Sequence, residues 1–215
     1  MKTLVKICGL TRAQDVETAM LYGADFLGFI VEAASKRRLS VETAAQIALP
    51  ARGLIPRVAV TVNADDDLLA RIMAQMQPDY IQCHGDEPPK RVAEIAKTFN
   101  VKTIKAVPIS TKTDMITAAE YALADFILYD AKPPKDGPKN IPRGGHGTAF
   151  DWSLLRTSPT PKFYALAGGL KPENTREAIA ATSAPMLDVS SGVEASAGIK
   201  DPAKIKAFME AVQNG

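Results

Sequence analysis

The sequence contains no run that approaches 18 consecutive apolar residues, which is about the length that a transmembrane helix requires. The first residues also lack the long apolar segment and the small-residue cleavage site of a secretory signal peptide. Cysteine is scarce, because Cys8 and Cys83 are the only two among 215 residues. These absences predict a cytoplasmic protein without a membrane partner, in which both cysteines are free thiols.

The chain has no excess of one charge sign, since 26 Lys and Arg residues face 24 Asp and Glu residues and the formal net charge is +2. This balance gives no support for binding to nucleic acid or to an anionic membrane. A small anionic ligand would therefore need a local site. No group of His, Cys, Asp and Glu has the spacing of metal ligands, and no Ser/His/Asp set stands out. Metal and acyl-enzyme chemistry are disfavoured.

Strand-like apolar runs alternate with helix-like segments from end to end, without a linker or a change of composition. The chain is 46% hydrophobic and 23% charged, which suits one compact domain over residues 1–215. Eight strands are predicted, at residues 4–8, 26–31, 57–62, 80–84, 101–107, 126–129, 163–167 and 186–189. Helices are predicted at residues 13–22, 41–49, 66–76, 88–99, 113–121, 152–156, 172–181 and 203–212.

Several predicted helices begin with recognisable capping residues. Thr11 with Gln14 resembles a capping box, and Ser40 directly precedes a helix. Proline suits the first helical turn because its missing N–H has no partner there, and this applies to Pro88, Pro172 and Pro202.

Eight strand and helix units in 215 residues average about 27 residues each, which is short but sufficient for a (β/α)8 TIM barrel. A Rossmann fold is the alternative. Its Gly-x-Gly-x-x-Gly signature should follow the first strand, but Cys8-Gly9-Leu10-Thr11 stands there. We therefore favour a single-domain α/β barrel.

Small residues follow the last two predicted strands and indicate a phosphate site. Gly168 and Gly169 end one apolar run, and Ser190, Ser191 and Gly192 end the next. Small residues let backbone N–H groups approach an anion closely, and a helix that follows adds a partial positive charge. In barrels the loops after strands 7 and 8 are a frequent phosphate site, so the position agrees with the strand count.

Cys8 is a candidate catalytic residue because it ends the first predicted strand, where barrel active sites lie. A thiol acts as a base only as its thiolate, which neighbouring positive charge favours, and Lys6 lies two residues earlier on the same strand. The alternative is a small buried hydrophobic residue. Cys83, inside the run Tyr80-Ile81-Gln82-Cys83, fits that alternative better.

Asp130 terminates another apolar strand, and a carboxyl group in this position is partly desolvated, which suits a general acid. A loop cap is the alternative. The segment that follows, residues 132–147, is rich in Pro, Gly and Lys. A loop of this length above a strand end is often functional, so we predict a mobile lid, with a surface excursion as the alternative.

Two further candidates lie near strand ends and carry nitrogen-containing side chains, a guanidinium and an imidazole. Arg37 lies in the loop after the second strand, and its planar guanidinium suits a carboxylate, whereas its neighbours Lys36 and Arg38 fit solvated charges. His84 precedes Gly85 and could bind substrate or could cap its loop.

Taken together, ordered motifs along nearly the whole chain resemble the phosphoribosylanthranilate isomerase family of tryptophan biosynthesis. They are Val5-Lys6-Ile7-Cys8-Gly9-Leu10-Thr11, Gly23-Ala24-Asp25-Phe26-Leu27-Gly28-Phe29, Ser35-Lys36-Arg37, Gln82-Cys83-His84-Gly85, Phe150-Asp151-Trp152, Ala167-Gly168-Gly169-Leu170-Lys171-Pro172-Glu173-Asn174 and Asp188-Val189-Ser190-Ser191-Gly192-Val193-Glu194.

The resemblance implies a cofactor-free Amadori rearrangement of N-(5-phosphoribosyl)anthranilate to 1-(2-carboxyphenylamino)-1-deoxyribulose 5-phosphate. It implies Cys8 as general base and Asp130 as general acid. It also implies that Arg37 holds the anthranilate carboxylate, that Asp188 contacts the sugar and that His84 binds substrate. The phosphate would be bound by Gly168, Gly169, Ser190, Ser191 and Gly192.

Two alternatives remain open at this stage. The first is another phosphate-binding barrel enzyme of tryptophan or histidine biosynthesis, which would share the glycine and serine loops. A synthase of this kind would need a catalytic set of lysine and glutamate, and a paired-aspartate sugar isomerase would need an aspartate near Cys8. A catalytically silent phosphate-binding barrel is the other, and the presence of both Cys8 and Asp130 speaks against it. The sequence leaves a monomer or a homodimer equally open.

Overall fold

The computed structural model describes residues 2–132, 150–158 and 160–215. Except for Lys132, the segment predicted as a lid lies outside these residues. Within the described part of the chain, no helix is long and apolar enough to cross a membrane.

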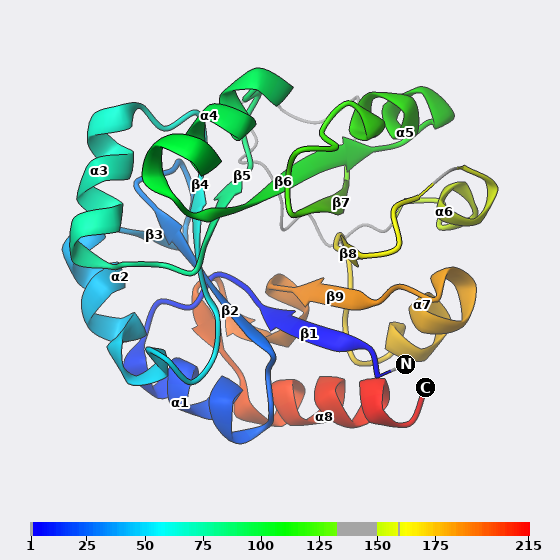
Figure 1. The fold of residues 1–215 in the computed structure, drawn as a ribbon. Helices are drawn as coiled ribbons and strands as arrows, with labels where there is room; N and C mark the ends of the chain where they lie inside the picture. Colours follow the sequence, from blue (N-terminus) through cyan, green and yellow to red (C-terminus); the bar gives the residue numbers. More distant parts are fainter. Residues whose placement is uncertain (1, 133–149, 159) are drawn as a thin grey trace.

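Eight parallel strands form a closed barrel (Figure 1). Their order around the ring is β1-β9-β8-β7-β6-β5-β4-β2, and pairing of β2 with β1 closes it. The strands are β1 (Leu4–Ile7), β2 (Phe26–Val31), β4 (Arg57–Thr61), β5 (Tyr80–Cys83), β6 (Lys102–Ile109), β7 (Phe126–Ala131), β8 (Tyr164–Leu166) and β9 (Met186–Val189). The predicted (β/α)8 barrel is confirmed.

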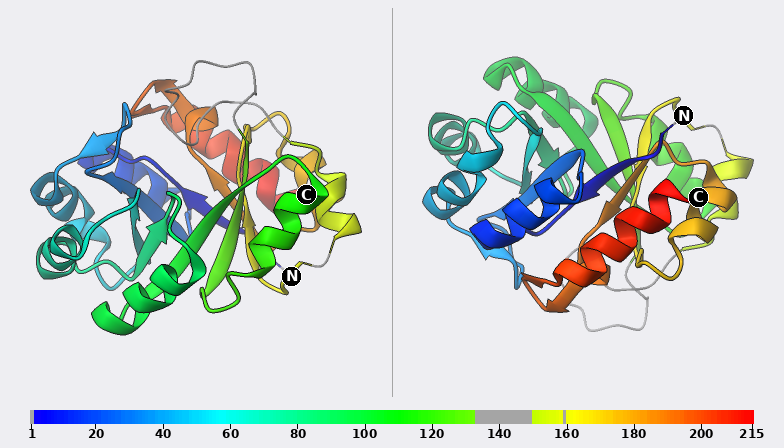
Figure 2. Two further views of the ribbon diagram at one scale, coloured as in Figure 1. Left: turned by 90° about the horizontal axis from the view of Figure 1, so that it is seen from above. Right: turned by 90° about the horizontal axis from the view of Figure 1, so that it is seen from below.

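Helices surround the barrel on its outer side (Figures 1 and 2), as expected when each connection between parallel strands crosses over the sheet. They are α1 (Ala13–Leu21), α2 (Val41–Ala48), α3 (Asp66–Gln75), α4 (Pro89–Phe99), α5 (Lys112–Ala119), α6 (Ser153–Thr157), α7 (Thr175–Thr182) and α8 (Pro202–Gln213), with short 3-10 turns η1 (Leu49–Ala51) and η2 (Ser191–Val193). Each predicted helix is present, with ends shifted by a few residues.

Alternating residues along the strands build two separate apolar layers. Val5 and Ile7 of β1 pack outward with the helices in the larger cluster. Cys8, which follows them, packs in a smaller cluster with residues such as Val60 and Leu128 that line the barrel interior. Because successive side chains of a strand point to opposite sides, alternate residues of each strand lie on the outer face or on the inner face of the barrel.

Aromatic rings fill the inner face near the strand beginnings. The Phe26 ring lies 5.6 Å from that of Tyr80 and 6.3 Å from that of Phe126, and Phe126 lies 5.1 Å from Phe163, mostly in edge-on arrangements. These residues occur at the first positions of their strands or just before them, so this end of the barrel is closed by side chains.

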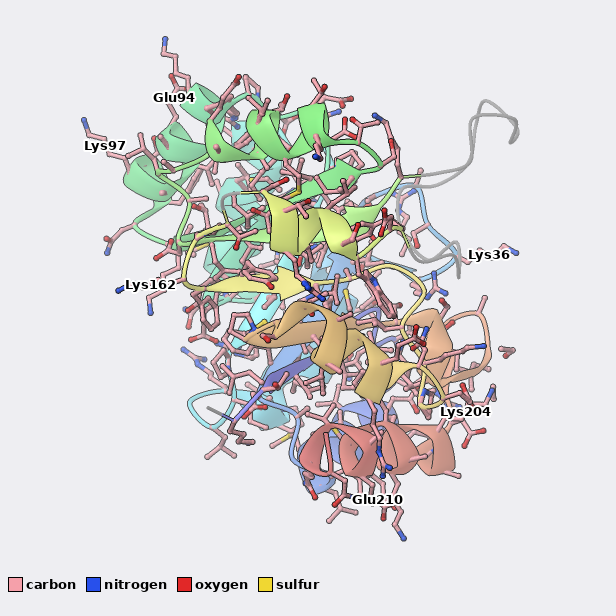
Figure 3. All side chains as sticks on the ribbon, turned by 90° about the vertical axis from the view of Figure 1, so that its right-hand side faces the viewer. Lys36, Glu94, Lys97, Lys162, Lys204 and Glu210 are labelled. Carbon is pink, nitrogen blue, oxygen red and sulfur yellow. The ribbon has the colours of Figure 1, made fainter. Side chains whose placement is uncertain are left out.

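The opposite end, where the strands finish, carries the loops that bear the candidate site residues. Figure 3 shows Lys36 on the side toward which the strand arrows point, together with Lys204, whereas Lys97 and Lys162 lie on the other side. Lys36 follows β2 and Lys162 precedes β8, as this direction requires.

The capping predictions were correct in part. The Ser40 hydroxyl accepts a hydrogen bond from the Thr43 N–H at the start of α2, and Pro202 stands in the first turn of α8. Thr11 was predicted wrongly, because Arg12 is the N-cap of α1 and the Thr11 hydroxyl donates instead to the Gly198 carbonyl. Local spacing could not reveal that distant acceptor.

Two proline predictions were shifted by one to three residues relative to the helix starts. Pro88 is the N-cap of α4, so that Pro89 takes the first turn, and α7 begins at Thr175 rather than near Pro172. In α7 the Asn174 side chain organises the preceding turn by accepting from the Lys171 N–H at 2.9 Å.

The structure also contains short strands that the sequence pattern did not predict. β3 (Arg38–Leu39) pairs with the end of β2, and β10 (Glu194–Ser196) forms an antiparallel hairpin with β11 (Ile199–Lys200). β7 continues to Ala131, so Asp130 lies inside a strand, opposite Pro108 of β6, and not after it. The extension of β7 places Asp130 on hydrogen-bonded backbone.

Candidate active site

Cys8 lies at the inner mouth of the barrel directly after β1. Its backbone N–H donates to the Val189 carbonyl of β9 at 2.8 Å, which continues the strand ladder and holds its side chain toward the interior. Burial raises the pKa of the Cys8 thiol, while the Lys6 ammonium acts in the opposite direction. Cys83 packs on the outer face, where burial raises its pKa to about 12, as expected for an unreactive thiol. Both cysteines are free.

Asp130 is buried on β7, and each of its oxygens has a different neighbour. Oδ1 accepts from the Ala131 backbone N–H at 2.8 Å, while Oδ2 lies 3.4 Å from Nε2 of His84. The strand therefore fixes one oxygen and leaves the other facing an imidazole. A carboxyl group held in this way has one oxygen available for proton exchange.

His84 follows β5 and lies between Gln82 and Asp130. Its Nδ1 is 2.8 Å from Nε2 of Gln82, which lies two residues earlier on the same face of the chain. Because an amide NH2 group only donates, Nδ1 accepts, and the ring proton then resides on Nε2, the nitrogen that faces Asp130. This tautomer makes His84 a hydrogen-bond donor toward the mouth of the barrel.

Arg37 is held by Glu194, which lies at the start of β10. Nε and Nη2 of Arg37 donate to the two carboxylate oxygens of Glu194, each at 2.7 Å. Lys200, opposite Glu194 in the hairpin, binds the same carboxylate at 2.9 Å and the Ser190 carbonyl at 3.0 Å. Burial disfavours the Glu194 carboxylate, but the two cations outweigh it and lower its pKa.

This ion pair leaves Arg37 with donors to spare. A guanidinium has five N–H groups, and the bidentate contact with Glu194 uses one edge of the fork. Within the described residues, Nη1 of Arg37 makes no hydrogen bond. The Arg37 chain passes close to Gly9, where an added Cβ would lie 2.5 Å from Cδ of Arg37 and 2.9 Å from Oγ of Ser190. Arg37 thus lies beside the loop after β9.

The loop after β8 has the glycine conformation that the phosphate prediction requires. Gly168 and Gly169 have φ angles of 89° and 64°, which favour glycine. Within the described part of the chain, their backbone N–H groups donate to no protein acceptor. The Asn174 amide donates to the Gly169 carbonyl at 2.9 Å and so holds the turn open.

The loop after β9 packs directly against that turn. A Cβ on Gly192 would collide with the carbonyl oxygen of Leu170 and would lie 3.0 Å from Cα of Lys171. Only glycine allows this approach. Ser190 and Ser191 lie in the same loop, Ser190 just before the 3-10 turn η2 and Ser191 at its first position. The two predicted phosphate loops therefore form one continuous surface.

Asp188 does not stand alone in the barrel. It lies on β9 opposite Lys6 of β1, and its Oδ1 is 2.9 Å from Nζ of Lys6. Both side chains are buried. Among the described residues, no group of three or more His, Cys, Asp and Glu side chains could hold a metal ion.

The sequence prediction did not assign a role to three residues that position the candidates. They are Gln82 beside His84, Asn174 beside Gly169 and Glu194 beside Arg37. Gln82 could have been found, because residues i and i+2 of a strand share a face. Glu194 could not, since 157 residues separate it from Arg37.

The fold and the site together define a (β/α)8-barrel enzyme in which the predicted phosphate loops lie beside buried acid and base candidates. The chain belongs to the N-(5'-phosphoribosyl)anthranilate (PRA) isomerase family, because the sequence model of that family matches residues 5–211.

Relatives of this family match the chain over its whole length. The isomerases of Parvibaculum lavamentivorans and Beijerinckia indica are 42% and 44% identical over 214 residues, which is 99% of this chain and 99% and 95% of theirs. The crystal structure of the Thermotoga maritima isomerase superposes with a TM-score of 0.87 at 37% identity, covering 99% of this chain and 100% of that one. A structure in complex with reduced 1-(o-carboxyphenylamino)-1-deoxyribulose 5-phosphate has a TM-score of 0.83 at 34% identity, with the same coverage.

Proposed function

We propose that this protein is an isomerase of L-tryptophan biosynthesis that converts N-(5-phosphoribosyl)anthranilate to 1-(2-carboxyphenylamino)-1-deoxyribulose 5-phosphate. The observation that carries the proposal is the placement of Cys8 and Asp130 around the ring. They lie at the ends of β1 and β7, and the two strands between them, β8 and β9, lead into the glycine and serine loops. A sugar phosphate bound at these loops has one candidate on either side.

In the proposed reaction, Asp130 protonates the furanose ring oxygen, and the C1′–O4′ bond breaks as the nitrogen lone pair forms a Schiff base. The Cys8 thiolate then removes the C2′ proton, and its electrons give an enolamine. Tautomerisation places a proton on C1′ and leaves a ketone at C2′. No oxidant, reductant or cofactor is needed, because C1′ is reduced while C2′ is oxidised within the same molecule.

Binding roles follow from the positions of the remaining residues. Arg37 would use its uncommitted N–H groups for the anthranilate carboxylate, and His84 would donate from Nε2 to the substrate beside Asp130. Asp188 would contact the sugar. The phosphate would be bound by Gly168, Gly169, Ser190, Ser191 and Gly192.

We further propose that residues 1–215 form one catalytic domain, which takes the small phosphorylated substrate as its partner and binds neither nucleic acid nor membrane. We place it in the cytoplasm, where phosphorylated intermediates are retained. A monomer and a homodimer both fit the barrel, and a related isomerase from Thermotoga maritima is dimeric.

The proposed function predicts a specific optical signal. Phosphoribosylanthranilate generated in situ from anthranilate is fluorescent, and micromolar enzyme is expected to remove that fluorescence as the rearranged product forms. Because substrate and product are isomers of equal mass, the product should be identified by its ketone. Fluorescence that decays at the rate of the protein-free sample would rule out the isomerase.

The phosphate loops predict stabilisation by inorganic phosphate, because a ligand that binds only the folded state adds RT ln(1 + [L]/Kd). At ten times its Kd, phosphate is expected to add about 1.4 kcal/mol and to raise Tm by about 3–6 °C. Calorimetry in chloride of matched ionic strength is the control. Equal Tm values in both salts, up to high phosphate, would contradict a preformed anion site.

Glu194→Gln is expected to raise KM by about tenfold and to change kcat less, because the neutral amide holds Arg37 at one point instead of two. The same change leaves the buried Lys200 and the half-buried Arg37 without their shared anion and should lower the free energy of unfolding by about 3 kcal/mol.

Glu210→Gln provides a matched control for this prediction. Glu210 lies 3.8 Å from Lys206 on the exposed surface of α8, and the two side chains are 58% and 57% exposed. This variant should keep both KM and Tm. An unchanged KM in Glu194→Gln would show that Arg37 needs no such support.

A further inference from the structure

An ion pair lies in the barrel interior directly below Cys8. Lys6 and Cys8 are two residues apart at the end of β1 and share its inner face, and Asp188 faces Lys6 across the β1 and β9 pairing. The Lys6 side chain is fully buried and that of Asp188 is 8% exposed, with 2.9 Å between Nζ and Oδ1. Charges in such a position interact strongly with a neighbouring thiol because water does not screen them.

The facing strand leaves room for the thiol and the ammonium to meet. Gly28 of β2 has no side chain, and a Cβ built there would lie 2.9 Å from Sγ of Cys8 and 3.0 Å from Nζ of Lys6. Both atoms thus converge on the space that a side chain at position 28 would fill. The missing side chain brings the Lys6 ammonium to the Cys8 thiol rather than leaving it with Asp188 alone.

We propose that Lys6 is a positioning residue that stabilises the thiolate of Cys8, and that Asp188 limits this effect by sharing the ammonium. The inference rests on the proposed function for its catalytic meaning, since it explains how a buried thiol reaches the form that removes a proton. The electrostatic part stands on the geometry alone.

Charged groups from four segments act on Cys8. Lys6 on β1 and Lys200 on β11 favour the thiolate, Asp188 on β9 disfavours it, and Arg37 reaches it from the loop after β2. Arg37 and Lys200 are both bound to Glu194, whose negative charge offsets them. Lys6 is therefore the cation whose removal should change the thiol most.

Lys6 keeps its charge despite its burial. Desolvation disfavours the ammonium, but Asp188 and Cys8 favour it more strongly and raise the Lys6 pKa above its ordinary value. The cation is accordingly present at every pH at which the enzyme would work. A thiolate formed on Cys8 would complete a buried group of one cation and two anions.

The test titrates Cys8 directly in a Cys83→Ala background, where it is the only cysteine. Cysteine labelled with 13C at Cβ reports the thiol and the thiolate by its chemical shift, so no reagent has to reach a buried atom. Lys6→Met is expected to raise the Cys8 pKa by at least about one unit, and Asp188→Asn to lower it. If the pair of Lys6 and Asp188 has only a structural role, the two substitutions should shift the Cys8 pKa in the same direction or leave it unchanged. Either result overturns the proposal.

A second comparison covers the case in which Lys6→Met does not fold because Asp188 remains buried without a partner. The double variant Lys6→Met/Asp188→Asn removes both charges at similar volume. Its Cys8 pKa should lie above that of Asp188→Asn alone, and equal values overturn the proposal. Isomerase assays on the Cys83→Ala parent, which keeps Lys6 and Asp188, separate the two hypotheses: absent turnover of this parent with shifted titrations in the variants rejects the function only, whereas turnover of the parent with unshifted titrations rejects the role of Lys6 only.

Discussion

Cys8→Ala is expected to lower kcat by about 10³-fold or more while the barrel stays folded. A positioned general base contributes about 10²–10⁴-fold to a proton transfer, and alanine has no group that can accept the C2′ proton. The loss of one buried sulfur should cost little stability, because alanine fits the small space between Gly28 and the end of β1. Steady-state kinetics and a thermal melt on the same preparation measure both effects.

Cys83→Ala is the matched control for this experiment. It removes the same atom from a buried cysteine, but on the outer face of β5 among the apolar residues that pack against helices. Its kcat should remain within about twofold of the parent, since a change outside the site acts on stability rather than on proton transfer. If Cys8→Ala also keeps kcat within tenfold, another base performs the reaction.

Asp130→Asn is expected to lower kcat by about 10²–10⁴-fold, because an amide cannot donate the proton that opens the furanose ring. Asparagine has the same shape and can still accept from the Ala131 N–H, so the end of β7 should keep its conformation. The dependence of kcat/KM on pH gives a second readout, because the limb that reports a protonated acid should disappear.

An exposed carboxylate serves as the comparison for Asp130. Asp67→Asn on α3 makes the same chemical change at the surface, and its pH profile should match that of the parent. His84→Gln should give a smaller loss than Asp130→Asn, since the imidazole lies 3.4 Å from Oδ2 and supports the acid without supplying the proton. If Asp130→Asn keeps the parental dependence of kcat/KM on pH, a different residue is the general acid.

Most of the architecture could be predicted from the sequence because it depends on short-range patterns. The eight apolar runs gave eight barrel strands, and the absence of a glycine fingerprint after Cys8 correctly spoke against a Rossmann fold. Gly168 and Gly169 could be placed in a turn because glycine readily adopts positive φ angles, and in the structure their φ angles are 89° and 64°. The ends of elements were less predictable, as Thr11 illustrates, since its acceptor Gly198 is 187 positions away.

The chain by itself determined which segments form the barrel strands and therefore which loops gather at one mouth of the barrel. Only the closed ring decided their partners, because it made β9 a neighbour of β1 and placed the β10 hairpin against the loop after β2. Lys6 with Asp188 and Arg37 with Glu194 are separated by 182 and 157 positions, and neither spacing carries a periodic signal. The physical reason is that strand formation is local, whereas the charge around Cys8 depends on which strands are adjacent after closure.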